Sequence, residues 1–438
     1  MRNRKVIIVG AGIGGLAAGC WLGKRGYEVE ILEASDRPGG RMVTLEHRGD
    51  RVDVGAQFYH SNFRCALEFL DALDLNGAKR TVAGKIHYAL GDGSTYLYNS
   101  RLPYMKLLGF RGNLQLYWFV LRHILLGPRF PDFEISRDMP AYDNRSIQDL
   151  FSSPSDRRMR DYLVKVITMG EALALPEWVS LAHYIRLFRM TLFESFFGLT
   201  RGVSMLAEEM AGQLPVQYEA PVEKLVAENG RVAGVEMAGD GSVRKSGHVI
   251  VAVTPPAAAR MMPEEFAEER SFFDSVVYSP LPMPVFFLDR PLRRDVSFYF
   301  NDPGLDRTFV FAIDAHAKVP EMCPSGKSAL TGWAVYPKTL ALMDEDDDEI
   351  LKKAREDMEL MIPGLSGWIE HATVHRHAFV NAIYPPGSYR SVLDFLDKAK
   401  ELKGVSFVSS VLRGMSMEAA MRSGADAVRR VCGWGGTM

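Results

Sequence analysis

Glycines near the amino end have the spacing of a turn that holds phosphate groups. The segment Gly10-Ala11-Gly12-Ile13-Gly14-Gly15 fits the pattern G-x-G-x-x-G. In this pattern Gly10 makes a tight turn, Gly12 lets the backbone approach a pyrophosphate, and Gly15 lets a helix pack closely on a strand. The free N–H groups at the start of that helix then face the phosphates. The chemistry predicted for Gly10, Gly12, Gly14 and Gly15 is therefore the binding of a dinucleotide.

An acidic residue completes this pattern. Glu33 stands twenty-three residues after Gly10, directly behind the apolar run Glu28-Val29-Glu30-Ile31-Leu32. Its carboxylate can accept hydrogen bonds from both hydroxyls of an adenosine ribose, whereas a 2′-phosphate would meet its negative charge. The expected ligand is a dinucleotide without that phosphate.

These residues need a strand, a helix and a second strand to position them. Lys5–Val9 is a β-branched run typical of a buried parallel strand, and 16–25 follows it as a helix. The uncharged stretch 6–23 also imitates a signal sequence or a membrane helix. It contains six glycines, each costing about 1 kcal/mol in a helix relative to alanine, and no A-x-A cleavage site follows. We therefore predict a βαβ unit.

Composition limits the class of protein. The chain has 438 residues, of which 47% are hydrophobic and 24% charged, so it can bury a large core and build two to three domains at about 150 residues each. A net charge of -2 provides no field for nucleic acid, and we expect no nucleic-acid partner. The four cysteines form no CxxC pair, which favours a reducing, cytoplasmic location.

The segments behind Glu33 carry a resemblance. The chain continues from Ala34 to Gly39-Gly40-Arg41, and later reads Val54-Gly55-Ala56-Gln57. It resembles the flavin-containing amine oxidase superfamily, which also holds phytoene desaturases and protoporphyrinogen oxidases. The resemblance implies FAD, with Glu33, Ala34, Gly40 and Arg41 in the segment against the pyrophosphate and with Gly55 and Ala56 on the flavin side. Independently of the resemblance, the Arg41 guanidinium can bind phosphate oxygens in pairs.

Later segments match the same family. The resemblance places the backbone of Val222 at the adenine, Ser410 at the ribityl chain, and Met417 at the start of a last helix aimed at the flavin. That helix end would stabilise the negative charge of a reduced flavin. The family usually has Asp where this chain has Ser410, so one charge-assisted contact of about 1 kcal/mol is lost. No cysteine lies in the flavin-facing segments at the end of the chain, so we expect noncovalent FAD.

The resemblance also predicts the domain organisation. We expect an α/β fold with a Rossmann-like FAD-binding domain of the GR2 type, built from 1–71, 200–270 and 400–434. The stretches 72–199 and 271–399 are expected to form a substrate-binding domain of helices and mainly antiparallel sheet.

The predicted substrate is a large, mostly apolar small molecule such as an isoprenoid. Many amine oxidases of the family keep a lysine near flavin N5 and an aromatic residue before the last helix, where this chain has Met283 and Ser416. An apolar wall favours removal of a hydride from a carbon–carbon unit, with O2 or another acceptor reoxidising FAD. The expected side-chain participants are Gln57, His60, Met283 and Tyr384. His60 is a candidate general base, although a structural histidine is the favoured interpretation.

Two other functions stay open at this point. The first is oxidation of an amine or an amino-acid-derived compound of secondary metabolism. The second is a flavoprotein without net redox chemistry, an isomerase or a binding partner, which the serine at position 410 motivates.

Two further patterns are interpreted as structural features without a role in chemistry. The apolar, basic segment 102–130 is too interrupted to span a bilayer. It is expected to pack in the substrate domain, with peripheral contact to a membrane as the alternative. His375-Arg376-His377 places two imidazoles on one face of a strand, but no acidic or cysteine ligand is near in sequence, so no metal is predicted. The oligomeric state stays open.

Overall fold

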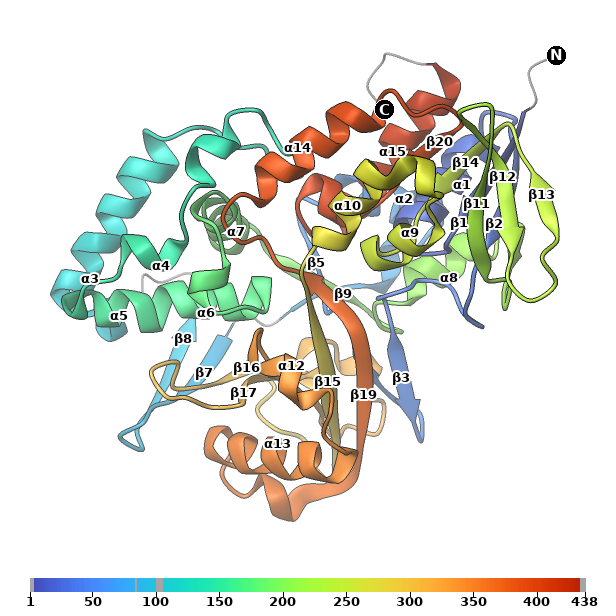
Figure 1. Cartoon of the computed structure of the whole chain (residues 1–438). Helices are drawn as coiled ribbons and strands as arrows, with labels where there is room; N and C mark the ends of the chain where they lie inside the picture. Colours follow the sequence, from blue (N-terminus) through green and yellow to red (C-terminus); the bar gives the residue numbers. More distant parts are fainter. Residues whose placement is uncertain (1–3, 83–84, 100–104, 434–438) are drawn as a thin grey trace.

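A parallel sheet forms one half of the molecule. The structure is a computed structural model that describes residues 4–82, 85–99 and 105–433 (Figure 1). Five strands lie in the order β10-β2-β1-β14-β20, and every neighbouring pair is parallel. Their bounds are β1 Lys5–Val9, β2 Glu28–Leu32, β10 Val216–Gln217, β14 His248–Val251 and β20 Val405–Phe407. The predicted Rossmann-like α/β architecture is confirmed, since strands from distant parts of the chain meet here.

Two helices, α1 (Ile13–Gly23) and α15 (Met417–Cys432), pack tightly beside this sheet. A Cβ atom added at Gly14 would lie 2.7 Å from the Ala420 carbonyl oxygen, and one added at Gly424 would lie 2.5 Å from the Gly14 carbonyl oxygen. The first and last helices therefore touch through their backbones, which joins the two ends of the chain.

A small antiparallel sheet lies on the outside of this half. It consists of β11 (Val222–Glu228), β12 (Arg231–Met237) and β13 (Val243–Lys245). Helices α8 (Met205–Ala211), α9 (Pro255–Met261) and α10 (Ala267–Ser275) lie nearby, as Figure 1 shows.

A seven-stranded sheet dominates the other half of the molecule. Its order is β19-β15-β18-β17-β16-β7-β8, and only β16 and β7 pair in parallel. The bounds are β7 Lys85–Ala89, β8 Thr95–Asn99, β15 Tyr278–Leu288, β16 Val296–Asn301, β17 Phe309–Asp314, β18 Ala329–Ala334 and β19 Ile369–Ala382. Helix α13 (Asp347–Met361) covers the sheet on the side away from the parallel sheet (Figure 1).

Most of the segment 105–193 is helical and forms a third region beside the large sheet (Figure 1). Helix α3 (Met105–Phe119) breaks at Gly109, where φ is 64°, and continues into the π-helical turn Val120–Leu125. It is followed by α4 (Ile147–Leu150), α5 (Arg157–Met159), α6 (Lys165–Ile167) and α7 (Leu181–Phe193). Residues 102–104 of the helical segment predicted from the sequence lie outside the described residues.

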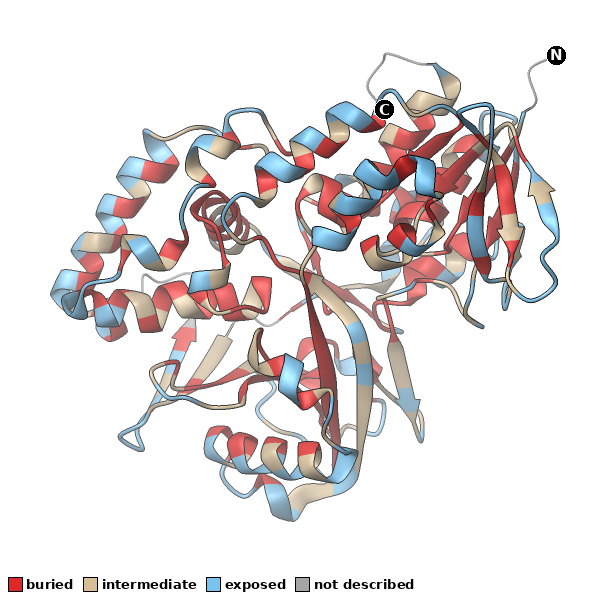
Figure 2. Cartoon of the chain, in the orientation of Figure 1, coloured by how far each residue is buried: buried red, intermediate tan, exposed pale blue. Residues whose placement is uncertain are grey.

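Short elements connect these regions. They are β3 Thr44–His47, β4 Asp50–Asp53, β5 Tyr59–His60, α2 Arg64–Ala72, β6 Lys79–Thr81, β9 Phe196–Leu199, α11 Ala315–Lys318, α12 Lys338–Leu342 and α14 Ser388–Ala399. Figure 2 shows buried residues running through both sheets and the helices between them.

Candidate functional site

One large cavity lies where the two halves of the molecule meet. Its volume is about 610 Å³, within the range of small-molecule and cofactor sites. Its wall brings together predicted residues that are far apart in sequence: Gly10, Gly12, Gly14, Glu33, Gly40, Arg41, Gly55, Ala56, Gln57, His60, Ser410 and Met417.

The glycines of the first turn have separate tasks. Gly10 has φ 103°, and a Cβ atom there would lie 2.6 Å from the Ala252 carbonyl oxygen. A Cβ atom on Gly15 would lie 2.2 Å from the Gly10 carbonyl oxygen, so Gly15 serves helix–strand packing and does not reach the cavity. A Cβ atom on Gly12 would meet only the Ala252 oxygen, at 3.9 Å. Gly12 therefore leaves open space in the cavity beside the amino end of α1, where a phosphate group is favoured.

Glu33 lies beside the glycine turn on the cavity wall, and backbone groups hold its carboxylate in place. Its Oε2 accepts a hydrogen bond from the Ala11 N–H at 2.7 Å, and its Oε1 accepts from the N–H and hydroxyl of Ser35 at 2.9 and 2.7 Å. A carboxylate has about four acceptor positions, so some stay open toward a ribose. The loop after β2 thus holds the carboxylate in one orientation at the cavity.

Arg41 links the nucleotide segments to the far end of the chain. Its guanidinium donates to the Val380 carbonyl oxygen at 3.0 Å and to the Ser410 hydroxyl at 3.1 Å. A Cβ atom on Gly55 would lie 1.9 Å from the Arg41 carbonyl oxygen, so only glycine fits there. This close approach places Gly55 and Ala56 beside Arg41 on the same wall.

The last helix begins at the cavity. Ser416 is its N-cap, and the Ser416 hydroxyl accepts from the Ala419 N–H at 3.0 Å. Glu418 is completely buried and accepts from the N–H groups of Cys65 and Ala66 at the start of α2. Since negative charge is favoured at a helix amino end, this contact holds α15 against α2. Glu418 was not predicted from the sequence, because Cys65, its partner on α2, is 353 residues away.

The described residues fit a bound dinucleotide. Gly12 leaves a cradle that a side chain would fill, two helix amino ends reach the wall, and one carboxylate and one guanidinium stand beside them. These groups match a ribose and a pyrophosphate, which need acceptors and donors respectively.

The rest of the cavity is apolar and aromatic. The large sheet contributes Phe298, Phe300, Phe311 and Trp333, and the rings of Phe311 and Trp333 stack with centroids 5.4 Å apart. One carboxyl group, that of Glu171, lies in this part of the wall next to Thr191, whose hydroxyl is 3.5 Å from Glu171 Oε1. Burial raises the pKa of Glu171 to about 7. The sequence analysis did not single out Glu171.

His60 lies at the border of the apolar part. Its ring stacks on Phe63, with centroids 4.9 Å apart, and meets the edge of Phe196. Burial lowers the pKa of the His60 imidazole to about 3, so the ring is neutral at pH 7. A neutral ring can accept a proton, but a pKa this low makes it a weak base.

Gln57 is held by a buried ion pair that the sequence analysis did not find. Lys318 Nζ lies 2.7 Å from Asp53 Oδ2 and 3.0 Å from Gln57 Oε1, and both charged side chains are at most 3% exposed. The Gln57 amide also donates to the Asp53 carbonyl oxygen at 2.6 Å. These bonds leave the Gln57 side chain a fixed position at the cavity wall.

Five predicted residues are not on the wall. Ala34 is exposed, and Val222 lies at the start of β11. Met283 is fully buried in the middle of β15, opposite His375 on β19. The Tyr384 hydroxyl donates to the Val411 carbonyl oxygen at 3.1 Å, and its ring stacks on His183. The structure therefore does not bring Gly15, Ala34, Val222, Met283 and Tyr384 to the cavity, and their predicted roles in binding or catalysis stay predictions.

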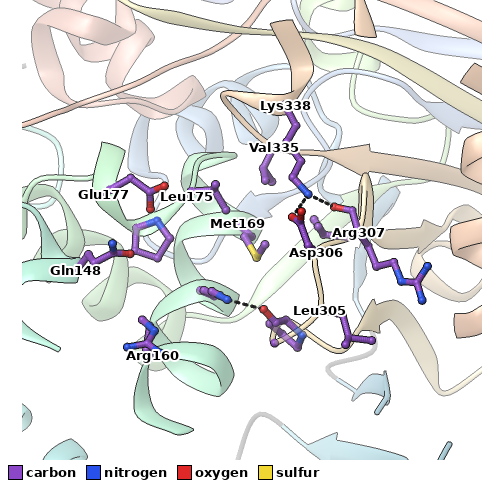
Figure 3. A pocket seen from close by; sticks show the side chains of 15 residues that line it. Gln148, Arg160, Met169, Leu175, Glu177, Leu305, Asp306, Arg307, Val335 and Lys338 are labelled. Atoms are coloured by element: carbon purple, nitrogen blue, oxygen red, sulfur yellow. Dashed lines mark hydrogen bonds and ion pairs between the residues drawn. The ribbon is translucent and has the colours of Figure 1, made fainter. Parts of the chain in front are cut away.

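A second, smaller cavity of about 290 Å³ lies between the helical region and the large sheet (Figure 3). Lys338 bonds to Asp306 and to the Arg307 carbonyl oxygen, and Lys165 donates to the Pro303 carbonyl oxygen at 2.7 Å. Its cations already have protein partners, and none of the predicted site residues lines it.

The main cavity therefore combines a wall that fits a dinucleotide with an apolar, aromatic part. The chain belongs to the flavin-containing amine oxidoreductase family, which matches residues 13–432. This membership confirms the resemblance, and the family implies a flavin cofactor.

Similar proteins act on different substrates. A 1-hydroxycarotenoid 3,4-desaturase from Flavobacterium sp. (strain P99-3) is 36% identical over 97 residues, which are 21% of this chain and 20% of that protein. A putative protoporphyrinogen oxidase from Exiguobacterium sp. 255-15 matches at a TM-score of 0.75 and 15% identity, over 98% of each chain. A putrescine oxidase bound to putrescine matches at 0.77 and 18%, over 98% of this chain and 99% of that one. The two structural matches show the fold. The sequence match to the desaturase covers only about a fifth of that protein's length.

Proposed function

We propose that the protein is an FAD-dependent dehydrogenase or desaturase of a large, mostly apolar small molecule. The observation that carries the proposal is one continuous cavity that runs from the glycine turn to a wall of stacked aromatic rings. Such a wall binds apolar carbon by excluding water, and it offers few groups to a charged substrate.

Noncovalent FAD is part of this proposal. Gly12 and the amino end of α1 would hold the pyrophosphate, Glu33 the adenosine ribose, and Arg41 a phosphate group. Ser410 and the amino end of α15 would stand at the ribityl chain and the flavin. When bound, FAD supplies an acceptor for a hydride removed from the substrate, and O2 or another acceptor takes the electrons onward.

The chain's own residues bind, orient and exclude water. Phe298, Phe300 and Phe311 hold the apolar substrate and keep water away from the cavity. Gln57 is locked by Lys318, so it presents a rigid polar edge at the border between the nucleotide and apolar parts. His60 contributes a neutral ring to the same border.

The experiment that tests the proposal starts from the absorbance spectrum of the purified protein. We expect a bound flavin that denaturation releases as free FAD. Isoprenoid substrates should bleach it without oxygen, and the product should have lost two hydrogens. A folded protein that is colourless and does not take up added FAD contradicts the proposal.

Oxidation of an amine is the second candidate, and Glu171 is the observation that favours it. A carboxylate among aromatic rings can bind an ammonium group through charge and cation–π contacts. In that case amines should reduce the flavin and release hydrogen peroxide in air, and Glu171→Gln should remove most of this activity. Unchanged product mass with either substrate class would instead support an isomerase.

A further inference from the structure

One helix carries an unusual share of the exposed apolar surface. Thirteen large hydrophobic side chains are exposed among the described residues, and seven of them lie between positions 110 and 126. We name these seven the α3 face: Phe110, Leu114, Tyr117, Trp118, Leu121, Leu125 and Leu126. The other six are scattered over separate elements. Single exposed apolar side chains are common on protein surfaces, whereas a group of them on one element indicates a binding surface.

Five of the seven residues share one side of the helix. After the break at Gly109, the helix runs without interruption from Phe110 through the π-helical turn to Leu125. The spacing of Phe110, Leu114, Tyr117, Leu121 and Leu125 is three or four residues, which places them in one stripe. Phe110 is 83% exposed and Leu125 is 68% exposed, so both residues lie mostly in solvent.

The opposite side of the helix is also apolar, and it is packed. Phe119 is completely buried, and its ring lies 5.6 Å from Tyr184 and 5.1 Å from Phe188 on α7. Leu116 and Ile124 join the same core. A helix that only had to pack on the substrate region would be polar on its outer side. The α3 face is therefore not needed for folding, and Figure 2 shows α3 with exposed stretches at the outer edge of the molecule.

Positive charge flanks the α3 face. Residues 105–130 contain Lys106, Arg111, Arg122 and Arg129 and no aspartate or glutamate, in a chain whose net charge is -2. Arg111 is 3.5 Å from Asp156, while Lys106, Arg122 and Arg129 form no ion pair with any other described residue. All four side chains are exposed.

We propose that the α3 face docks the protein on a membrane surface that contains anionic lipid. Aromatic and leucine side chains enter the boundary between headgroups and acyl chains, while lysine and arginine contact the phosphates. No helix among the described residues is long and apolar enough to cross a membrane. This inference does not depend on the reaction that the cavity performs.

A second copy of the chain fits this surface less well. A twofold interface would place the α3 face against itself and bring the same cations together. No carboxylate between positions 105 and 130 would pair with them. An anionic lipid surface satisfies the apolar and the basic residues together.

Cosedimentation with vesicles tests the proposal. The probes are vesicles of phosphatidylcholine alone and of phosphatidylcholine with phosphatidylglycerol. We expect the full-length protein to bind the second kind at least tenfold more tightly, and to lose part of this binding in high salt.

Two variants and one matched control make the result specific. Leu121→Glu/Leu125→Glu places charge on the α3 face and should weaken vesicle binding at least tenfold. Arg122→Glu should remove most of the preference for anionic lipid. Leu340→Glu, at an exposed leucine of α12, should bind vesicles like the wild type. The circular dichroism spectrum checks that each variant is folded.

Three outcomes would overturn the proposal. The wild type binds neither kind of vesicle, or Leu121→Glu/Leu125→Glu binds as tightly as the wild type. In the third outcome, light scattering shows that the wild type is a dimer and that Leu121→Glu/Leu125→Glu is a monomer. The α3 face is then an interface between two copies of the chain.

Discussion

Lys318 and Asp53 form an ion pair with almost no access to solvent. Their charged atoms are 2.7 Å apart, and neither side chain is more than 3% exposed. The second oxygen of Asp53 accepts from the Val203 N–H at 2.8 Å and from the Thr44 hydroxyl at 2.7 Å. Lys318 also donates to both oxygens of Gln57. One buried cation therefore joins α11, which follows β17 of the large sheet, to the loop that carries Gln57 on the cavity wall.

Lys318→Met should destabilise the protein strongly. It leaves the Asp53 carboxylate buried without its cation, which typically costs about 3 to 5 kcal/mol. Urea unfolding measures this change. Lys327→Met is the matched control, since Lys327 is 2.8 Å from Glu370 in an exposed pair worth about 1 kcal/mol or less. Similar losses in both variants would show that burial of the first pair has no special energetic role.

Gly12→Ala and Gly15→Ala should separate cofactor binding from folding. The added Cβ at position 12 enters open cavity space, so the protein should keep its thermal midpoint and bind FAD at least tenfold more weakly. The added Cβ at position 15 would lie 2.2 Å from a backbone oxygen, so Gly15→Ala should unfold at a lower temperature. FAD titration and thermal melts of both variants check this. Tight FAD binding by a folded Gly12→Ala protein contradicts the assignment of the turn.

His60→Phe should be well tolerated. Phenylalanine keeps the ring contacts with Phe63 and Phe196, and the imidazole is already uncharged because burial lowers its pKa to about 3. We expect the rate of flavin reduction by substrate to change less than tenfold, as measured by stopped-flow absorbance. A loss of a hundredfold or more would instead identify His60 as a general base.

The meeting of the amino-terminal segments on one cavity wall was predictable from sequence, because its signals are local. The glycine turn, Glu33, Arg41 and Gly55 follow one another within 46 residues and meet on one wall. Each depends on a backbone conformation or a close approach that neighbouring residues already specify.

The other parts of the site could not be predicted, because they depend on contacts between positions far apart in the sequence. Lys318 and Asp53 are 265 residues apart, and Glu171 reaches the cavity through π-helical turns that no simple period describes. The alignment with the family placed Met283 near the flavin, but the structure buries it between neighbouring strands of the large sheet. The apolar segment 102–130 was expected to be a packed helix, and its pattern did not reveal which side faces solvent.

Glu171 should make the stability of the folded protein depend on pH. Burial raises the pKa of Glu171 to about 7, above its value in the unfolded chain. The folded state therefore keeps the proton that the unfolded state has already released between about pH 4.5 and 7, and stability falls as pH rises through this window. Glu171→Gln cannot ionise, so it should become more stable relative to the wild type as pH increases from 5 to 8.

Thermal unfolding of the two proteins at several pH values measures this difference. Asp314, whose pKa burial also raises to about 7, is present in both and cancels in the comparison. Glu177→Gln is the control for removing a glutamate at an exposed position, and its curve should run parallel to that of the wild type. Parallel curves for Glu171→Gln as well would mean that the Glu171 carboxyl is hydrated in the folded protein. The apolar part of the cavity would then hold water rather than exclude it, which would weaken the case for an apolar substrate.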